Sequence, residues 1–180
     1  MKKLFFSILL ILSLTSLKCS KDPVTIPDQL PPITTTGPNT FGCKVDGNVW
    51  LPYGGFSLDA ITVSGGIIGK SSDIQIVTCN RKNNAQTDID LIFQNIFDTG
   101  TYKIFNHLNE GMVYSDGNDG YEPFDTFGVV HISRCDTSNN IIAGTFSFMG
   151  YTDNTHVKKV NITDGRFDLH YPVKIHFMGQ

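Results

Sequence analysis

The segment Asp88-Ile89-Asp90-Leu91-Ile92-Phe93-Gln94 decides the fold class of this chain, because apolar and polar side chains alternate along it. Successive side chains of a β-strand point to opposite faces of the sheet, so Ile89, Leu91 and Phe93 share one face. The polar side chains of Asp88, Asp90 and Gln94 alternate with these residues and point to the opposite face. We therefore expect a strand with one buried face and one face in water.

The same alternation recurs along the chain between short turn signals. Further strands are expected at Phe41 to Val45, Val49 to Leu51, Phe56 to Ser64, Asp73 to Arg81, Thr101 to Asn106, Gly111 to Tyr114, Asp125 to Cys135, Ile141 to Met149, Val157 to Thr163 and Arg166 to Tyr171. Turns are expected at sites that include Asp46-Gly47, Gly65-Gly66, Asp116 to Gly120, Asp136 to Asn140 and Asp164-Gly165. This spacing predicts an all-β fold, a single antiparallel β-sandwich, with a closed β-barrel as the alternative.

The composition agrees with an all-β chain of one domain. The 180 residues include three alanines and two glutamates, against 18 isoleucines, 17 threonines and 13 phenylalanines. Good helix formers are therefore rare, and β-branched and aromatic residues are plentiful. The 14 lysines and arginines are scattered and outnumbered by 17 acidic residues, which argues against a basic face and a nucleic-acid partner.

The N-terminus has the pattern of a secretion signal. The basic start Met1-Lys2-Lys3 is followed by the apolar run Leu4 to Leu17, shorter than the roughly 20 residues that span a bilayer. Cys19 follows this run and resembles the cysteine of a lipobox, although Lys18 occupies a position where a small residue is usual. We predict a lipoprotein signal peptide over residues 1–18 and membrane attachment through acylated Cys19, with a conventionally cleaved secreted protein or an uncleaved anchor as alternatives.

Residues 19–39 are expected to be a flexible, lipid-anchored linker. Five of the eight prolines lie between Pro23 and Pro38, and no apolar period accompanies them. The segment is therefore expected to be dispensable for folding, and the β-domain to occupy residues 40–180. Ser20-Lys21-Asp22 resembles a short signal of Bacteroidota lipoproteins, which implies a cell-envelope location as an outer-membrane lipoprotein, periplasmic or surface-exposed. The alternative is that these residues are the solvated start of the linker.

Several sequence blocks carry a resemblance to a known family. They are Leu30-Pro31-Pro32, Thr36-Gly37, Asn39 to Cys43, Val45-Asp46-Gly47, Val49-Trp50, Gly100-Thr101-Tyr102, Ile141 to Phe148 and Ile162 to Asp168. In this order they resemble an uncharacterised family of Bacteroidota lipoproteins. The match covers both ends of the chain well and Gly54 to Phe97 poorly. It implies a lipidated β-domain and no catalytic residue or cofactor.

After acylation of Cys19, three cysteines remain, Cys43, Cys79 and Cys135. They allow one disulfide with three alternative pairings, or three free thiols that behave as small apolar residues. The chain has no CxxC motif, so metal binding by these thiols is the least favoured interpretation.

No metal or other cofactor is predicted from the remaining polar residues. The five histidines have no metal-ligand spacing and are His107, His131, His156, His170 and His176. The segment Asp116 to Gly120 has the composition of a calcium loop, but its glycine occupies the wrong position for an EF-hand. A hairpin turn is therefore expected there, with calcium binding as the alternative.

Five aromatic residues in or beside expected loops form a candidate binding rim, namely Tyr53, Phe56, Tyr114, Tyr121 and Phe124. Such a rim would bind a protein or a glycan, and the alternative is that these rings pack loops onto the sheet. No GxSxG, HExxH, P-loop or dinucleotide motif is present. The sequence favours a non-catalytic binding or structural module of the cell envelope over the alternative, a small secreted hydrolase of envelope or extracellular glycan or peptide.

Overall fold

The computed structural model describes residues 29–54, 59–68, 71–82, 85–96, 98–106, 111–124, 127–152, 155 and 157–171. The strands in this part of the chain are β1 (Thr40–Val45), β2 (Asn48–Trp50), β3 (Ile61–Ile68), β4 (Ser71–Asn80), β5 (Thr87–Gln94), β6 (Gly100–Ile104), β7 (Gly111–Ser115), β8 (Gly120–Tyr121), β9 (Gly128–Asp136), β10 (Ile141–Tyr151) and β11 (Lys159–His170). The expected signal peptide, Cys19 and Phe56 lie outside the described residues. No helix of the described part is long and apolar enough to cross a membrane.

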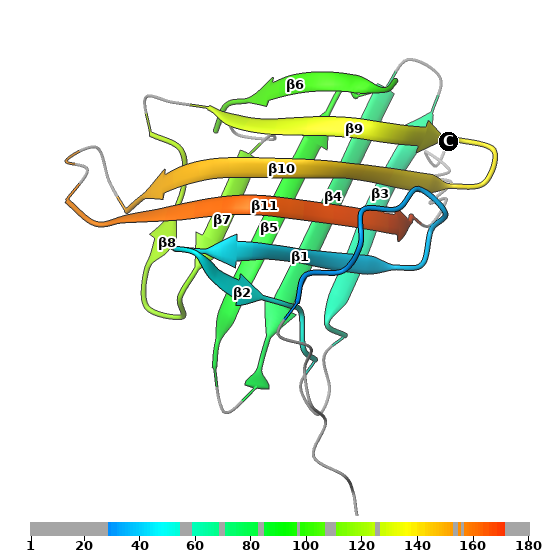
Figure 1. Cartoon of the computed structure of the whole chain (residues 1–180). Helices are drawn as coiled ribbons and strands as arrows, with labels where there is room; N and C mark the ends of the chain where they lie inside the picture. The colour runs from blue at the N-terminus through cyan, green and yellow to red at the C-terminus, as the bar shows by residue number, and fades with distance from the viewer. Residues whose placement is uncertain are drawn as a thin grey trace, which may run out of the picture.

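The strands form two antiparallel sheets that pack face to face. One sheet has the order β2-β1-β11-β10-β9-β6 and the other the order β3-β4-β5-β7-β8. The strands of the six-stranded sheet run across those of the five-stranded sheet behind it (Figure 1). This arrangement confirms the predicted antiparallel β-sandwich rather than its closed alternative.

A line of aromatic rings fills the core between the sheets. Phe41 meets Trp50 edge to face at 6.2 Å between ring centroids and lies 5.3 Å from Phe146. Phe146 lies 6.4 Å from Phe167, which lies 6.0 Å from Phe93 of the opposite sheet. These separations suit tilted and edge-to-face aromatic pairs, which contribute about 1 kcal/mol each beyond their buried area. The line therefore joins β2, β1, β10 and β11 to β5.

The alternation read from the sequence is confirmed in β5, where Ile89, Leu91 and Phe93 are fully buried. The turn expected at Asp46-Gly47 is also present between β1 and β2, and both residues have positive φ angles, as a tight hairpin requires. Gly65-Gly66 differs from the prediction, because it lies within β3 and pairs with β4 instead of forming a turn.

The segment predicted as two strands separated by a turn at Asp164-Gly165 forms one continuous strand, β11. Both halves pair with β10, and the register shifts between Phe146 and Phe148. Asp164 adopts a left-handed backbone conformation with a φ of 51°, and this accommodates the extra residue that β11 has relative to β10. A Cβ on Gly165 would lie 2.5 Å from the carbonyl oxygen of Phe146, so only glycine fits there. The dipeptide therefore makes a β-bulge, which shares the sequence signature of a turn.

Residues 29–39, here called the strap, lie across the outer face of the six-stranded sheet, against β1 and β11 (Figure 1). The backbone amides of Thr36 and Gly37 donate hydrogen bonds to the two carboxylate oxygens of Asp168, each at 2.8 Å. Asp168 is on the outward side of β11, yet only 1% of it is exposed. The strap therefore covers this carboxylate and satisfies it with two charge-assisted hydrogen bonds.

Further polar contacts fasten the strap along its length. Arg166 donates to the carbonyl oxygen of Pro31 at 3.2 Å, and Arg134 donates to that of Thr35. The side chain of Asn39 accepts from the backbone amide of His170 at 2.9 Å. The structure thus differs from the expected linker in its last part, because residues 29–39 pack on the domain. Proline-rich segments can be held by polar contacts, which leave no apolar period in the sequence.

We expect Asp168→Asn to lower the free energy of unfolding by about 2 kcal/mol, because it removes the charge from two buried hydrogen bonds and turns one acceptor into a donor. For a domain of this size, that change lowers the Tm by roughly 5 °C. Thermal denaturation followed by circular dichroism measures it. The control is Asp164→Asn, which removes an exposed ion pair on the same strand and should change stability by less than about 1 kcal/mol.

A chain that begins at Thr40 should likewise melt several degrees below a chain that begins at Gln29. Equal melting temperatures for these two chains would show that the strap does not contribute to the stability of the domain.

Candidate functional site

A row of polar side chains crosses the outer face of the six-stranded sheet. The strand register places Thr101 of β6 opposite His131 of β9, His131 opposite Thr145 of β10, and Thr145 opposite Arg166 of β11. Side chains directly opposite each other on neighbouring strands lie on one face, with Cβ atoms about 5 Å apart. These four residues, here called the polar row, therefore bring hydroxyl, imidazole and guanidinium groups together.

A hollow of about 300 Å³ opens over the polar row, between it and the strap. This outer-face hollow is lined by Ile33, Val129, His131, Thr145, Phe146, Ser147, Asp164, Gly165 and Arg166. Ile33 of the strap is 60% exposed and forms an apolar wall beside the polar residues. The hollow has the size of a small ligand pocket and combines hydrogen-bonding groups with an apolar surface.

Hydrogen bonds orient the charged and titratable groups of the polar row before any ligand is present. The imidazole Nδ1 of His131 lies 3.0 Å from the hydroxyl of Thr101, and the His131 ring remains exposed. The guanidinium of Arg166 donates through Nε to the backbone oxygen of Asp164 at 3.1 Å and through Nη1 to that of Pro31 at 3.2 Å. Groups held in this way lose less freedom when a ligand binds.

The carboxylate at the border of the hollow is already neutralised by a lysine. Lys44 Nζ lies 2.8 Å from Asp164 Oδ2, and this hydrogen-bonded ammonium group lowers the pKa of the Asp164 carboxyl. Asp164 is therefore ionised at neutral pH and can accept hydrogen bonds from hydroxyl groups, while its charge is offset locally.

Two exposed phenylalanines extend the same face beyond the hollow. Phe127 lies just before β9 and two positions before Val129, so it continues the outward side of that strand. The centroid of its ring lies 5.6 Å from that of Phe105. Phe105 is 44% and Phe127 38% exposed, the largest values for aromatic side chains in the described part of the chain. Lys103 Nζ stacks over the Phe127 ring at 4.3 Å from its centroid. This aromatic pair offers a flat apolar surface next to a cation.

The aromatic residues predicted to form a binding rim occupy other places. Tyr114 is 8% exposed and its ring lies 5.8 Å from that of Tyr121, so these two come together on β7 and β8. Tyr53 is half-buried and pairs with Asn80 of β4, which β5 separates from β7 and β8. Phe124 is half-buried and follows β8 in the chain. Phe56 lies outside the described residues. The structure therefore unites only part of the rim.

The sequence analysis missed the polar row and the aromatic pair, although one signal for them was present. Phe127, Val129 and His131 occupy every second position before and within β9, opposite the fully buried Val130 and Ile132. This alternation identifies the outward face of one strand. It does not reveal which strands are neighbours, so it could not bring His131 beside Thr145 of another strand.

The loop with the composition of a calcium site is a turn held by Asp116, and its Asp119 pairs with Lys158. Asp116 Oδ1 accepts the backbone amides of Asn118 at 2.9 Å and Asp119 at 2.8 Å, and Oδ2 accepts the hydroxyl of Tyr121 at 2.9 Å. The backbone hydrogen bonds lower the pKa of the Asp116 carboxyl. Within the described ranges, no cluster of three or more His, Cys, Asp or Glu residues could hold a metal ion.

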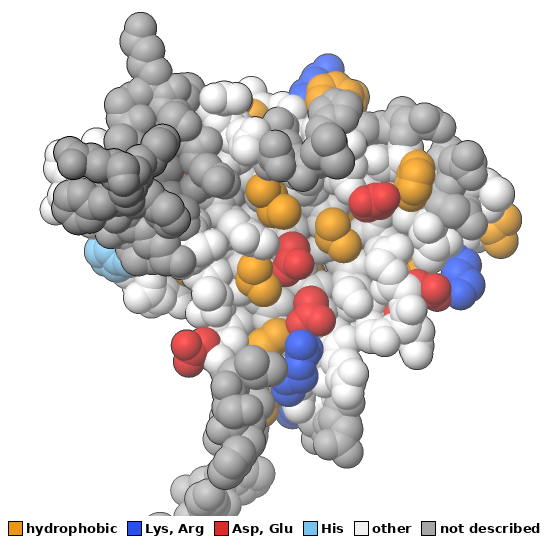
Figure 2. Space-filling view, turned by 180° about the vertical axis from the view of Figure 1, so that it is seen from behind, with side chains coloured by type: hydrophobic (Ala, Val, Ile, Leu, Met, Phe, Trp, Pro, Cys, Tyr) orange, Lys and Arg blue, Asp and Glu red, His pale blue; other side chains and the backbone are white. Residues whose placement is uncertain are grey.

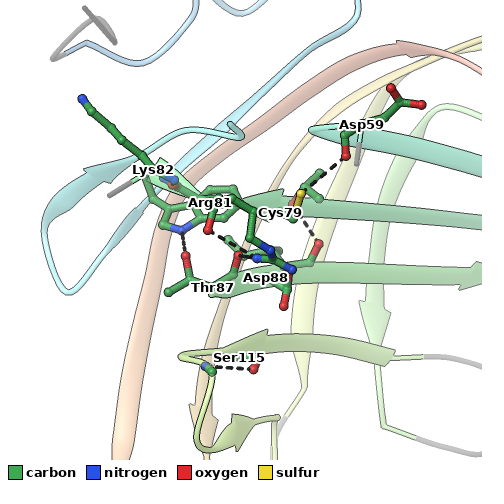
Figure 3. Close-up of polar contacts among 12 residues, drawn as sticks. Asp59, Cys79, Arg81, Lys82, Thr87, Asp88 and Ser115 are labelled. Carbon is green, nitrogen blue, oxygen red and sulfur yellow. Dashed lines mark hydrogen bonds and ion pairs between the residues drawn. The ribbon is translucent and has the colours of Figure 1, made fainter. Parts of the chain in front are cut away.

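The three cysteines of the domain, Cys43, Cys79 and Cys135, are free thiols. Burial raises the pKa of all three, and that of Cys43 to about 12. Cys79 Sγ donates to the backbone oxygen of Asp59 at 3.4 Å (Figure 3). Because the thiolate is the reactive form of cysteine, these neutral thiols are poor nucleophiles. They are packing residues rather than a reactive site.

A polar cluster at one end of β4 and β5 joins the two sheets. Arg81 forms an ion pair with Asp88 at 2.7 Å and donates to the backbone oxygen of Thr87 at 3.0 Å (Figure 3). The Thr87 hydroxyl in turn accepts the indole N–H of Trp50 at 2.9 Å. Trp50 belongs to β2 of the six-stranded sheet and Thr87 to β5 of the other. The cluster therefore fixes a corner of the sandwich.

No family model, curated protein or solved structure matches the chain. The outer-face hollow is therefore interpreted from its own residues and geometry. It combines oriented hydrogen-bonding groups, an apolar wall and a nearby aromatic pair on one open sheet face.

The opposite face of the molecule, formed by the five-stranded sheet, mixes hydrophobic and acidic side chains (Figure 2). Asp90 of β5 lies opposite Val77 and Val113, and its Oδ1 atom is buried without a hydrogen-bond partner among the described residues. Burial, and secondarily the charge of Asp88, raises the pKa of Asp90 from 3.8 to about 6. The folded protein therefore holds an ionised carboxylate at neutral pH at a cost in stability.

We expect Asp90→Asn to raise the Tm at about pH 7.5 and to have no effect on it below about pH 4. The unfolded chain ionises Asp90 near its ordinary pKa of 3.8 and the folded chain near 6, so the cost develops between these values as the pH rises. Thermal melts of both proteins across this range measure the difference. A difference in Tm that is independent of pH would contradict a raised pKa at Asp90.

Proposed function

We propose that the chain is a lipid-anchored, non-catalytic glycan-binding module of a bacterial cell envelope, akin to the Bacteroidota lipoproteins that its sequence blocks resemble. The observation that carries this proposal is the outer-face hollow, where the polar row meets the apolar wall of Ile33. Its open position on a sheet face would admit one unit of a longer chain molecule.

The chemistry of the hollow matches the chemistry of sugars. A sugar ring presents many hydroxyl groups, which both donate and accept hydrogen bonds, and patches of apolar C–H surface. Thr145, His131 and Arg166 supply complementary polar groups, while Ile33 offers an apolar contact. The exposed rings of Phe105 and Phe127 lie on the same sheet face and would stack against a further sugar unit.

The strap relates this site to the proposed anchor. If Cys19 is acylated, the start of the strap at residue 29 lies ten positions after it in the chain. An extended chain of ten residues spans at most about 35 Å, so the domain would stay within this distance of the lipid surface. The fastened strap thus gives a shorter tether than a linker that runs to residue 39. Such a module would collect glycans close to the membrane.

Glycan binding is tested by screening the protein against a panel of bacterial and plant oligosaccharides, followed by calorimetry on those that bind. We expect Thr145→Val and Phe127→Ala each to weaken binding by about tenfold, because they remove a hydrogen bond and a stacking surface. Val157→Ala is the matched control, since Val157 is an 83% exposed apolar residue outside the hollow. Binding that neither substitution alters would place the ligand elsewhere on the protein.

Lipid attachment is tested by growing cells that express the full-length protein with labelled palmitate. We expect the protein to incorporate the label and Cys19→Ala to abolish incorporation, because the thiol at residue 19 is the acceptor of the acyl chain. Cys43→Ala serves as the control, as it removes a thiol that is buried in the core. Incorporation that survives Cys19→Ala would refute the proposed anchor.

A further inference from the structure

Beside the outer-face hollow and the aromatic pair, the six-stranded sheet carries two cations that form no ion pair with a carboxylate among the described residues, Arg166 and Lys103. Arg166 donates only to backbone oxygens there, and Lys103 lies over the ring of Phe127. Three further cations lie on this face: Lys44 is paired with Asp164, Arg134 is paired with Asp136, and Lys159 lies at the far end of β11. The guanidinium group of Arg166 and the ammonium group of Lys103 are therefore not used in ion pairs within the described part of the chain.

Two acidic residues lie two positions from Arg166 along β11, and neither forms an ion pair with it. Asp164 at the border of the hollow is paired with Lys44. Asp168 is covered by the strap, and both of its oxygens accept backbone amides from it. The chain as a whole has a net charge of −3, so attraction for an anion on this face is confined to the immediate surroundings of these two cations. A ligand carboxylate placed against either cation would form a charge-assisted hydrogen bond.

Building on the proposed glycan binding, we propose that the ligand of the outer-face hollow is an acidic oligosaccharide with uronic-acid units. Its carboxylate would contact the guanidinium of Arg166, and its hydroxyl groups would contact Thr145 and Ser147. A guanidinium matches the planar, singly charged carboxylate of a uronate with two parallel hydrogen bonds. The remaining units would extend across the strands to Lys103 and the rings of Phe105 and Phe127.

The strand order sets the length of the ligand. Arg166 lies on β11 and Lys103 on β6, with β10 and β9 between them. Neighbouring strands are about 4.8 Å apart, so the two cations lie roughly 14 Å apart across the sheet. A single sugar ring cannot span this distance. The ligand that uses both cations is therefore an oligosaccharide that runs perpendicular to the strands.

Calorimetry with the full-length protein in detergent, at low salt, tests the inference with two matched probes, an oligogalacturonate and its fully methyl-esterified form. We expect the oligogalacturonate to bind about tenfold more tightly than the methyl ester, because the oligogalacturonate carries negatively charged carboxylates and the ester is neutral. Raising the salt concentration from about 0.05 M to 0.5 M should weaken the binding of the acidic probe and leave the binding of the ester unchanged.

Arg166→Gln should remove most of the preference for the acidic probe. Arg166 also holds the strap at Pro31, so its substitution can change stability as well as binding. Lys103→Gln is therefore the second variant, and it should weaken the binding of the acidic probe without lowering the Tm. Lys159→Gln is the control, since it removes a charge from the far end of β11, about 20 Å from Arg166 along the strand. This control should bind like the wild type.

The outcomes separate this inference from the proposed function. Equal affinity for the acidic probe and its ester would overturn the uronate preference and leave glycan binding in place. Failure of both probes and of the whole oligosaccharide panel would overturn both proposals. Binding of inorganic phosphate that no oligosaccharide displaces would show a site for a free anion, which also overturns the inference.

Discussion

The buried carboxylate of Asp168 is the interaction on which the outer face of the six-stranded sheet depends. A carboxylate that is almost fully covered needs hydrogen-bond donors, and the strap supplies two backbone amides. This contact fixes the strap at Thr36 and Gly37, and its neighbour Ile33 is thereby held at the border of the hollow. An electrostatic requirement at one residue thus shapes the apolar wall of the candidate site.

The same three strands build the core and the candidate site. Residues such as Val130, Phe146 and Phe167 face the opposite sheet, while the alternate positions His131, Thr145 and Arg166 supply three of the four residues of the polar row. The dense packing of the inward side chains fixes the strand register, and the register fixes which outward side chains are neighbours. The packing of the core therefore determines the geometry of the hollow.

The strap gives the domain a distinctive relation between attachment and binding. Under the proposed function, the chain leaves its lipid anchor, meets the domain at residue 29 and reaches the border of the hollow at Ile33, so the strap and the candidate site share one sheet face. Attachment to the membrane would then bias which side of the sandwich faces an approaching glycan. The five-stranded sheet, whose outer face mixes hydrophobic and acidic side chains, lies on the other side of the molecule.

The sequence alone determined the features that depend on neighbouring residues. The period-two pattern around Ile89 to Phe93 predicted the strand β5 and its buried face, and Asp46-Gly47 predicted the hairpin between β1 and β2, because both signals act within a few residues. Only the tertiary structure decided the strap, since the contacts of Thr36 and Gly37 reach Asp168, 132 and 131 positions away. It also decided the polar row and the bulge in β11, because strand order and register arise from packing across the whole chain, which no local pattern encodes.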